Sequence, residues 1–275
     1  MKKIIAFNWK MSPSSLKESE QIIKIFQNPR SMIHDPGSMI RDPRLIICPP
    51  FIFLQPLSKL LKTKNYKFKI HLGAQDVFWA KQGAFTGEIS ASMLKNLGVK
   101  YVIIGHSERR NWQNETDEII NKKIKIALET GLKIILCVGE NLSVRKKGIK
   151  FVKQFIKSQL QKDLSKLCPY GTSREARQTT NYKLQTNLIV AYEPIWAIGT
   201  GNYCNPKDAV EVVKFIKQTL NPKVIINSKV LYGGSVNSKN IKDYLKYKEI
   251  DGVLVGGASV NKKELKLILK NLNAI

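Results

Sequence analysis

The stretch from Lys229 to Ser259, KVLYGGSVNSKNIKDYLKYKEIDGVLVGGAS, holds two short apolar runs that each end on a pair of glycines. The runs are KVLY and GVLV, and a mostly polar segment separates them. Short, continuously apolar runs are typical of parallel strands that are covered on both faces. The stretch therefore predicts one repeat of an alternating β/α fold.

Six more runs of the same kind come earlier in the chain, which makes eight. They are IIAF, LIIC, FKIHLGA, YVIIG, KIILCVG and LIVAY, beginning at residues 4, 45, 68, 101, 133 and 188. Eight strands that each precede a helix, over 275 residues, favour a closed (β/α)8 barrel. An open, doubly wound sheet is the alternative. No linker interrupts the pattern, so residues 1–275 are expected to form a single domain.

Helical periodicity lies between the apolar runs. The expected helix faces share apolar residues at helical spacing: Leu16, Ile23 and Phe26; Ile120, Ile124 and Leu128; Ala209, Val213, Ile216 and Leu220; Leu265, Ile268, Leu269 and Leu272. Gly131 is expected to end the second helix, and Asn205-Pro206 to begin the third. Asn261 with Glu264 is expected to begin the fourth.

Two segments do not fit this rhythm. The first, near residues 29–43, contains S-M-I-x-D-P twice and also holds His34. The second, near 168–187, is polar. Each follows a predicted helix, so both are interpreted as surface excursions at the end of the barrel away from the chemistry. Neither suggests a function.

The chain is strongly basic, with a formal net charge of +25. Such a charge points to an anionic metabolite, to weak nucleic-acid affinity, or to a lysine-rich composition without function. The lysines are spread through the predicted helices instead of forming one block. No stretch approaches the roughly 18 apolar residues of a membrane span, and the N-terminal apolar run is too short for a signal peptide.

The four cysteines, Cys48, Cys137, Cys168 and Cys204, form no C-x-x-C pair. This spacing favours a reduced, cytoplasmic protein without a structural metal. No membrane partner and no specific nucleic-acid partner are expected.

Polar side chains follow several of the apolar runs, at the ends of the predicted strands where barrel enzymes place their chemistry. Asn8 and Lys10 follow the first run, Gln75 and Asp76 the third, His106 the fourth and Glu193 the sixth. A carboxylate, an imidazole and an ammonium suit proton transfer beside a carbonyl group. Taken singly, His106 is either structural or catalytic, Lys10 is one lysine of many and Glu193 could serve an ion pair. His71 is expected to be a core or rim histidine.

The glycine pairs that follow the last two runs predict a phosphate site. In (β/α)8 barrels the loops after strands 7 and 8 usually form the phosphate-binding site, and glycine lets the backbone approach an anion closely. The residues concerned are Gly233, Gly234, Gly256 and Gly257, with Ser235 adding a hydroxyl. One such pair alone would be interpreted as a tight turn.

Eight motifs together resemble the triosephosphate isomerase family. They are NWKM, GAQDV, GAFTGEIS, IIGHSERR, CVGE, AYEPIWAIGTG, YGGSV and VGGAS, in the family's order and over nearly the whole chain. The two excursions lie outside the resemblance. It implies a (β/α)8 barrel that interconverts glyceraldehyde 3-phosphate and dihydroxyacetone phosphate without a cofactor or metal.

The resemblance also implies a role for each matching residue. Glu193 is the base, His106 polarises the carbonyl and passes protons between oxygens, Lys10 supplies fixed positive charge, and Asn8 places the substrate. Ser107 and Glu108 support these groups. The phosphate is expected to be held by four residues: Gly199, Ser235, Gly256 and Gly257. The apolar segment after Glu193 is expected to act as a lid.

Thr86, in GAFTGE, matches a loop that projects into a neighbouring subunit in the family, which implies a homodimer. Phe7 and Ser12 depart from the family's commoner residues, a small residue and asparagine, without touching a named catalytic group. Two other functions remain open at this point: another phosphate-binding barrel enzyme, and a basic nucleic-acid-binding protein.

Overall fold

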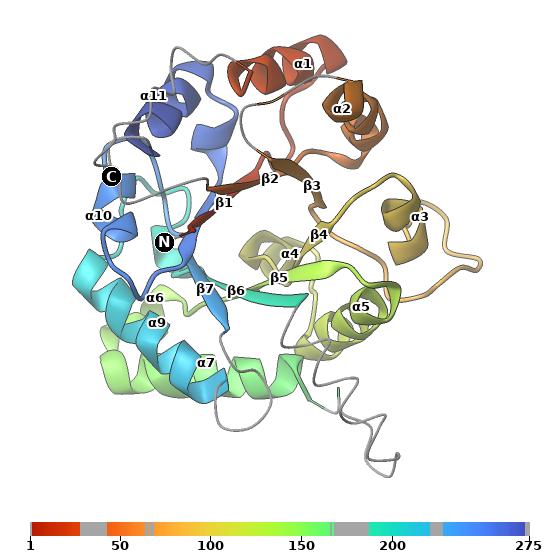
Figure 1. The fold of residues 1–275 in the computed structure, drawn as a ribbon. Helices are drawn as coiled ribbons and strands as arrows, with labels where there is room; N and C mark the ends of the chain where they lie inside the picture. Colours follow the sequence, from red (N-terminus) through yellow and green to blue (C-terminus); the bar gives the residue numbers. More distant parts are fainter. Residues whose placement is uncertain are drawn as a thin grey trace.

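The apolar runs form parallel strands that close into one barrel (Figure 1). The computed structural model describes residues 2–27, 43–63, 66, 69–165, 167, 187–220 and 228–272. Each strand pairs with the next one in sequence, and β8 closes the ring on β1. The strands are β1 Ile4–Asn8, β2 Arg44–Cys48, β3 Ile70–Ala74, β4 Tyr101–Ile104, β5 Lys133–Val138, β6 Leu188–Tyr192, β7 Lys229–Tyr232 and β8 Gly252–Val255.

Both faces of these strands are buried, which explains why the apolar runs do not alternate with polar residues. Residues such as Ile46, Tyr101 and Ile135 fill the inside of the barrel. Their neighbours, such as Ile47 and Val102, belong to the larger core between the barrel and its helices. The expected closed barrel is confirmed, and the open sheet is excluded.

Helices surround the barrel (Figure 1). They are α1 Leu16–Ile25, α2 Phe51–Thr63, α3 Ala91–Asn96, α4 Ser107–Trp112, α5 Asp117–Thr130, α6 Leu142–Lys146, α7 Ile149–Asp163, α9 Pro206–Leu220, α10 Ile241–Leu245 and α11 Lys262–Leu272, with short 3-10 helices η2 Ile195–Ala197 and η3 Gly257–Ser259. The barrel and these helices make a single domain.

The expected helix ends match the structure. Gly131 adopts the left-handed conformation at the end of α5, with φ of +78°, and side chains of Asn205 and Asn261 accept backbone N–H groups at the starts of α9 and α11. Leu16, the first residue of α1, is 41% exposed, whereas Ile23 and Phe26 are buried in the core. The excursions near 29–43 and 168–187, with His34, fall almost entirely outside the described residues.

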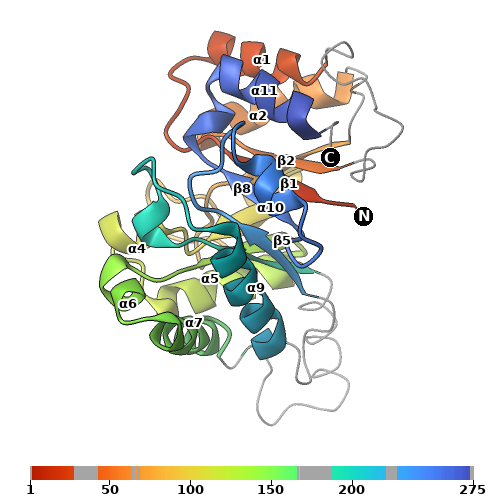
Figure 2. The same ribbon diagram turned by 90° about the vertical axis from the view of Figure 1, so that its left-hand side faces the viewer.

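The two ends of the barrel differ in what they carry. Figure 2 shows α4 and the segment after β6 at one end, and the N-terminus, where β1 begins, at the other. The first of these ends holds the carboxyl ends of the strands, where the polar side chains singled out above lie. No helix within the described ranges is long and apolar enough to cross a membrane.

Candidate active site

A cavity of about 350 Å³ opens at the carboxyl ends of the strands. Its wall contains eight of the residues predicted from sequence, drawn from the ends of β1, β4, β6, β7 and β8 and from the loop after η2. They are Asn8, Lys10, His106, Glu193, Gly199, Ser235, Gly256 and Gly257. Ser107 and Glu108 follow His106 at the start of α4. The fold therefore gathers into one site residues that are nearly 250 positions apart.

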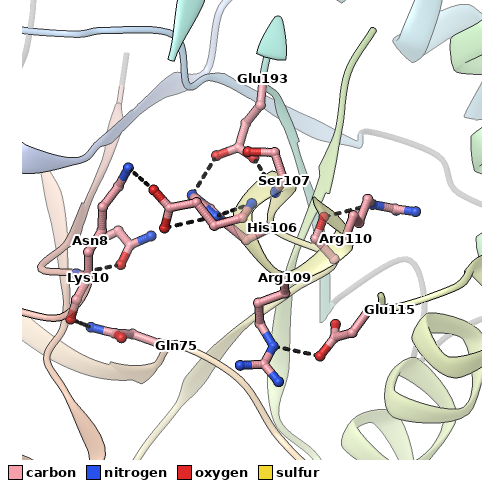
Figure 3. Close-up of polar contacts among 11 residues, drawn as sticks. Asn8, Lys10, Gln75, His106, Ser107, Arg109, Arg110, Glu115 and Glu193 are labelled. Carbon is pink, nitrogen blue, oxygen red and sulfur yellow. Dashed lines mark hydrogen bonds and ion pairs between the residues drawn. The ribbon is translucent and has the colours of Figure 1, made fainter. Parts of the chain in front are cut away.

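Glu193 is the most enclosed charged group of this wall. It follows β6, is 2% exposed, and its backbone N–H donates to Val138 O at 2.8 Å. Its carboxylate oxygen Oε1 lies 3.3 Å from His106 Nε2, and Oε2 accepts a long hydrogen bond of 3.4 Å from the Ser107 N–H (Figure 3). A Cβ on Gly233 would lie 2.9 Å from Glu193 Cγ, so glycine is needed there to leave room for the carboxylate.

The tautomer of His106 follows from its hydrogen bonds. The residue is the N-cap of α4, and its Nδ1 accepts the backbone N–H of Glu108 at 3.2 Å. A ring nitrogen that accepts a hydrogen bond carries no proton, so the imidazole is neutral and its proton sits on Nε2. That N–H points toward Glu193 and the cavity.

Lys10 is held in an unusual backbone conformation, with φ of +54°. Its N–H donates to Asn8 Oδ1 at 3.0 Å, and its carbonyl accepts from Gln75 Nε2 at 2.8 Å. Its Nζ forms an ion pair with Glu108, which is drawn in Figure 3. A non-glycine residue in this region is strained, and such strain persists where surrounding contacts fix it, commonly at functional sites.

Another part of the cavity wall is built from turns with little side-chain cover. A Cβ added at Gly199 or Gly257 would meet nothing within 4 Å, so the backbone is open there. Ser235 has φ of +42°, and its hydroxyl donates to Ala197 O. These turns leave room for an anion to approach the main chain.

The segment between Glu193 and these turns is hydrogen-bonded to Glu140, which follows β5. Trp196, within η2, donates its Nε1–H to Glu140 Oε1 at 2.9 Å. Glu140 is fully buried and also accepts from Tyr192, and burial raises the pKa of its carboxyl group. Gly199 and Gly201 have φ of +71° and +77°, so both positions favour glycine.

Asp76, the other strand-end carboxylate, serves a different network. Both of its oxygens accept from Lys123 Nζ at 2.7 Å, and Lys123 also pairs with Glu115. Burial is the largest influence on Asp76 and raises its pKa to about 6 despite these partners. Asp76 thus belongs to an ion-pair network and does not line the first cavity. No cluster of three or more His, Cys, Asp or Glu residues among the described positions is arranged to hold a metal ion.

A family model described as "Triosephosphate isomerase" matches residues 3–272 of the chain. The chain belongs to the triosephosphate isomerase family. The triosephosphate isomerase of Aquifex aeolicus is 42% identical over 277 residues, covering 98% of this chain and 99% of that protein. That of Dictyoglomus thermophilum is 42% identical with the same coverage, and that of Thermoanaerobacter pseudethanolicus is 40% identical over 94% of each chain.

Membership of the triosephosphate isomerase family confirms the resemblance carried by the eight motifs and the expected isomerase. It also decides against the two alternatives, another phosphate-binding barrel enzyme and a nucleic-acid-binding protein. The individual roles of Glu193, His106, Lys10 and Asn8 stay predictions, now with a geometry that suits them. Thr86 is exposed and lies outside the cavity wall of its own chain.

Some residues of this triosephosphate isomerase site were not assigned by sequence reasoning. Gln75 was seen at a strand end, but its amide bonds to Lys10 O and Cys48 O could not be foreseen. Gln159, on α7, accepts the N–H of Gly139 at 3.0 Å beside Glu193, and no sequence signal marks it. Asn237 lines the cavity two positions after Ser235, and that proximity was the only available signal.

Proposed function

We propose that Glu193 is the base with which this triosephosphate isomerase interconverts glyceraldehyde 3-phosphate and dihydroxyacetone phosphate. The observation that carries the proposal is the buried contact of 3.3 Å between its carboxylate and the protonated Nε2 of a neutral His106. A base and a hydrogen-bond donor placed so close can act on a carbon and on its neighbouring oxygen in one step. In the triosephosphate isomerase family, a glutamate acts as the base and a neutral histidine as the electrophile, and the pair described here matches that arrangement.

In the forward direction Glu193 removes the proton from C2 of glyceraldehyde 3-phosphate. The electron pair of the broken C–H bond forms the C1–C2 double bond, and negative charge moves onto the aldehyde oxygen. His106 Nε2–H donates its proton to that oxygen and recovers a proton from the hydroxyl on C2. Glu193 then returns its proton to C1 and the ketone forms at C2. Hydrogen moves only as protons, so the reaction needs no redox cofactor.

Lys10 stabilises the charge that develops on oxygen. Its ammonium group lines the cavity, and Glu108 holds it in place through their ion pair. Asn8 fixes the strained Lys10 backbone and lines the same wall, so it serves to place the substrate. A preorganised charge of this kind acts without reorganisation at the moment of reaction.

The substrate phosphate is proposed to lie against Gly199, Ser235, Gly256 and Gly257. Supporting this are the open backbone at Gly199 and Gly257 and the place of all four residues in the wall of the cavity that Lys10 also lines. The apolar segment after Glu193 is proposed to close over the substrate and exclude water. Its two positive-φ glycines give it a place to bend.

The enzyme is proposed to be a homodimer. A second cavity, of about 650 Å³, shares Asn8, Lys10 and His106 with the first and is bordered by Met11 and Trp112. These two side chains are 97% and 78% exposed, unusual for residues of that kind. The partner subunit's Thr86 would enter this cavity. Light scattering should give twice the 31.2 kDa of one chain, and a mass of one chain would contradict the dimer.

A cytoplasmic location is also proposed. Supporting it, the cysteines of the described segments, Cys48, Cys137 and Cys204, are free thiols.

The isomerase activity is tested by converting glyceraldehyde 3-phosphate in an assay coupled to reduction of dihydroxyacetone phosphate. We expect a turnover number at least as high as that of ordinary enzymes, which is on the order of 1 to 10³ per second. Absence of turnover in folded, dimeric protein would contradict the proposal.

A further inference from the structure

Basic residues mark the amino ends of the strands, at the end of the barrel opposite the active site. Six of the eight strands begin with, or directly follow, a lysine or arginine: Lys3, Arg44, Lys69, Lys100, Lys133 and Lys229. Figure 2 places this end on the side of the N-terminus, far from α4. The +25 charge of the chain, which the isomerase reaction does not explain, is thus partly concentrated at one mouth of the barrel.

In the half of this mouth formed by β2 to β5, the basic groups gather around Tyr101. Burial raises the pKa of its hydroxyl and the nearby Arg44 guanidinium opposes that rise, Lys133 Nζ lies 5.8 Å from the centre of its ring, and the His71 ring is 5.7 Å away. Tyr101 faces the inside of the barrel, together with Ile46 and Ile135. Since side chains alternate along a strand, Arg44 and Lys133, each two positions earlier, face the barrel axis as well.

Lys69 and Lys100 are exposed at the edge of this group, which we call the cationic mouth: Arg44, Lys69, Lys100 and Lys133. Lys100 lies directly beside Lys133, whose N–H donates to the Lys100 carbonyl at 2.9 Å. Neighbouring parallel strands are about 4.8 Å apart. Positive charges on adjacent strands are therefore close enough for linked anionic groups to contact more than one of them.

The positive charge of the cationic mouth is not neutralised by any carboxylate in the described part of the chain. The other half of the same rim differs, because Asp251 pairs there with Lys217 at 2.6 Å and with Lys229 at 3.0 Å. Burial, and then the cations Lys100, Arg44, Lys69 and Lys133, lower the pKa of His71 to about 4. Burial and neighbouring Arg44, Lys100 and Lys95 lower the pKa of Lys133 in the same way. Cations held this close repel one another, and a bound anion would reduce that repulsion.

The chemistry of the cationic mouth suits clustered phosphate groups. A guanidinium binds a phosphate through two parallel N–H bonds, and ammonium groups act on it as point charges. Tyr101 is 1% exposed, so it offers no face on which a nucleic-acid base could stack. Two or three linked phosphates would match four cations better than a single phosphate would.

We propose that the cationic mouth binds a short polyphosphate chain, either inorganic triphosphate or the phosphate tail of a nucleoside triphosphate. The cationic mouth is separate from the residues proposed to bind the substrate phosphate in the active site. The proposal therefore does not depend on the isomerase mechanism described above.

Calorimetric titration of the full chain with sodium tripolyphosphate tests this proposal. Saturating glycerol 3-phosphate is included to fill the active site. Wild-type protein should bind the triphosphate with an affinity that falls as salt is raised. The variant R44Q/K133Q should bind at least about tenfold more weakly, the effect of losing two charged contacts. Binding that disappears when glycerol 3-phosphate is present would overturn the proposal, because the active site would be the only site.

The matched control is K153Q/K214Q, which removes the same charge from two lysines paired with Glu211 and Glu249. Its affinity should stay within about twofold of wild type, and an equal loss would show a general charge effect. Because Arg44 supports Tyr101, the second variant K69Q/K100Q covers the case in which R44Q/K133Q does not fold. It changes only exposed side chains, and an unchanged affinity in this variant would contradict the proposal.

Two further measurements complete the test. Triphosphate should raise the pKa of the His71 imidazole, followed by NMR, since the bound anion offsets the surrounding cations. ATP and inorganic triphosphate should bind alike if the phosphate tail alone is recognised, whereas binding of ATP alone would narrow the ligand to a nucleoside triphosphate. Binding of a single-stranded oligonucleotide without binding of triphosphate would overturn the proposal in favour of a nucleic acid.

Discussion

Oε1 of Glu193 lies 3.3 Å from Nε2 of His106, and the hydrogen bond that His106 Nδ1 accepts from Glu108 keeps the proton on Nε2. The end of β6 thus positions the base, Glu193, and the start of α4 positions the electrophile, His106, so that the two side chains are in contact. Ser107 N–H supplies the second contact to the carboxylate.

Gly233→Ala should lower kcat by about 10², because an added Cβ would lie 2.9 Å from Glu193 Cγ and push the carboxylate aside. Gly257→Ala is the comparison, since its Cβ would meet nothing within 4 Å. That variant should raise KM for the phosphorylated substrate more than it lowers kcat. Steady-state kinetics on both proteins decides, and a full kcat in Gly233→Ala would contradict the steric account.

Gln159→Met should lower kcat by roughly tenfold with little change in KM. Gln159 accepts the N–H of Gly139, and a Cβ on Gly139 would lie 1.7 Å from the Glu193 carbonyl oxygen, so these two backbones are in contact. Loss of the acceptor leaves a buried N–H unpaired and loosens the support of Glu193. Gln159→Glu keeps an acceptor and should recover most of the rate. A purely structural role would instead lower the melting temperature and leave kcat unchanged.

Deletion of residues 195–198 should increase loss of inorganic phosphate from the reaction intermediate. The segment contains η2 and connects Glu193 to Gly199, and its Ile198 lines the cavity. Without it, water reaches the enediolate and the geometry of the phosphate is no longer controlled. Phosphate released per isomerised substrate measures the effect. An unchanged ratio would show that the segment does not act as a lid.

The barrel and the set of site residues were predictable from sequence because both depend on local signals. Strands buried on both faces give continuous apolar runs, and a barrel places chemistry where those runs end, as with Asn8, His106 and Glu193. What sequence could not give is contact between distant elements. Lys123 carries a charge that would be expected to face solvent, yet it is 2% exposed and pairs with Asp76, which is 47 positions earlier in the chain. Short helices such as α3 and α10 contain too few turns to show a period.

The free energy of unfolding of the wild-type protein should fall as pH rises from about 4 to 7. In Asp163→Asn the same free energy should depend less on pH. Burial raises the pKa of Asp163 to about 7, even though Arg110 pairs with it at 2.6 Å. The pKa of an unfolded aspartate is about 3.9. The folded state therefore binds the extra proton, and its stabilisation is complete below about pH 4 and lost as pH passes 7.

The loss attributable to Asp163 is on the order of 4 kcal/mol, because each unit of pKa difference is worth about 1.4 kcal/mol, and it appears as a lower melting temperature. Thermal unfolding at several pH values and one fixed protein concentration measures it. Asp76, with a pKa raised to about 6, titrates in the same range in both proteins, so only the difference between the curves reports Asp163. Parallel curves for wild type and variant would contradict the assignment.

The most direct test of the central claim is the turnover of Glu193→Gln, measured together with its affinity for glycerol 3-phosphate. The substitution keeps the size of the side chain and removes the base, so kcat should fall by about 10² to 10⁴ or more. Melting temperature and affinity for the phosphate analogue should stay close to wild type, because neither requires the negative charge. A variant with near wild-type kcat, or one that loses folding and activity together, would contradict the role of Glu193 as the base.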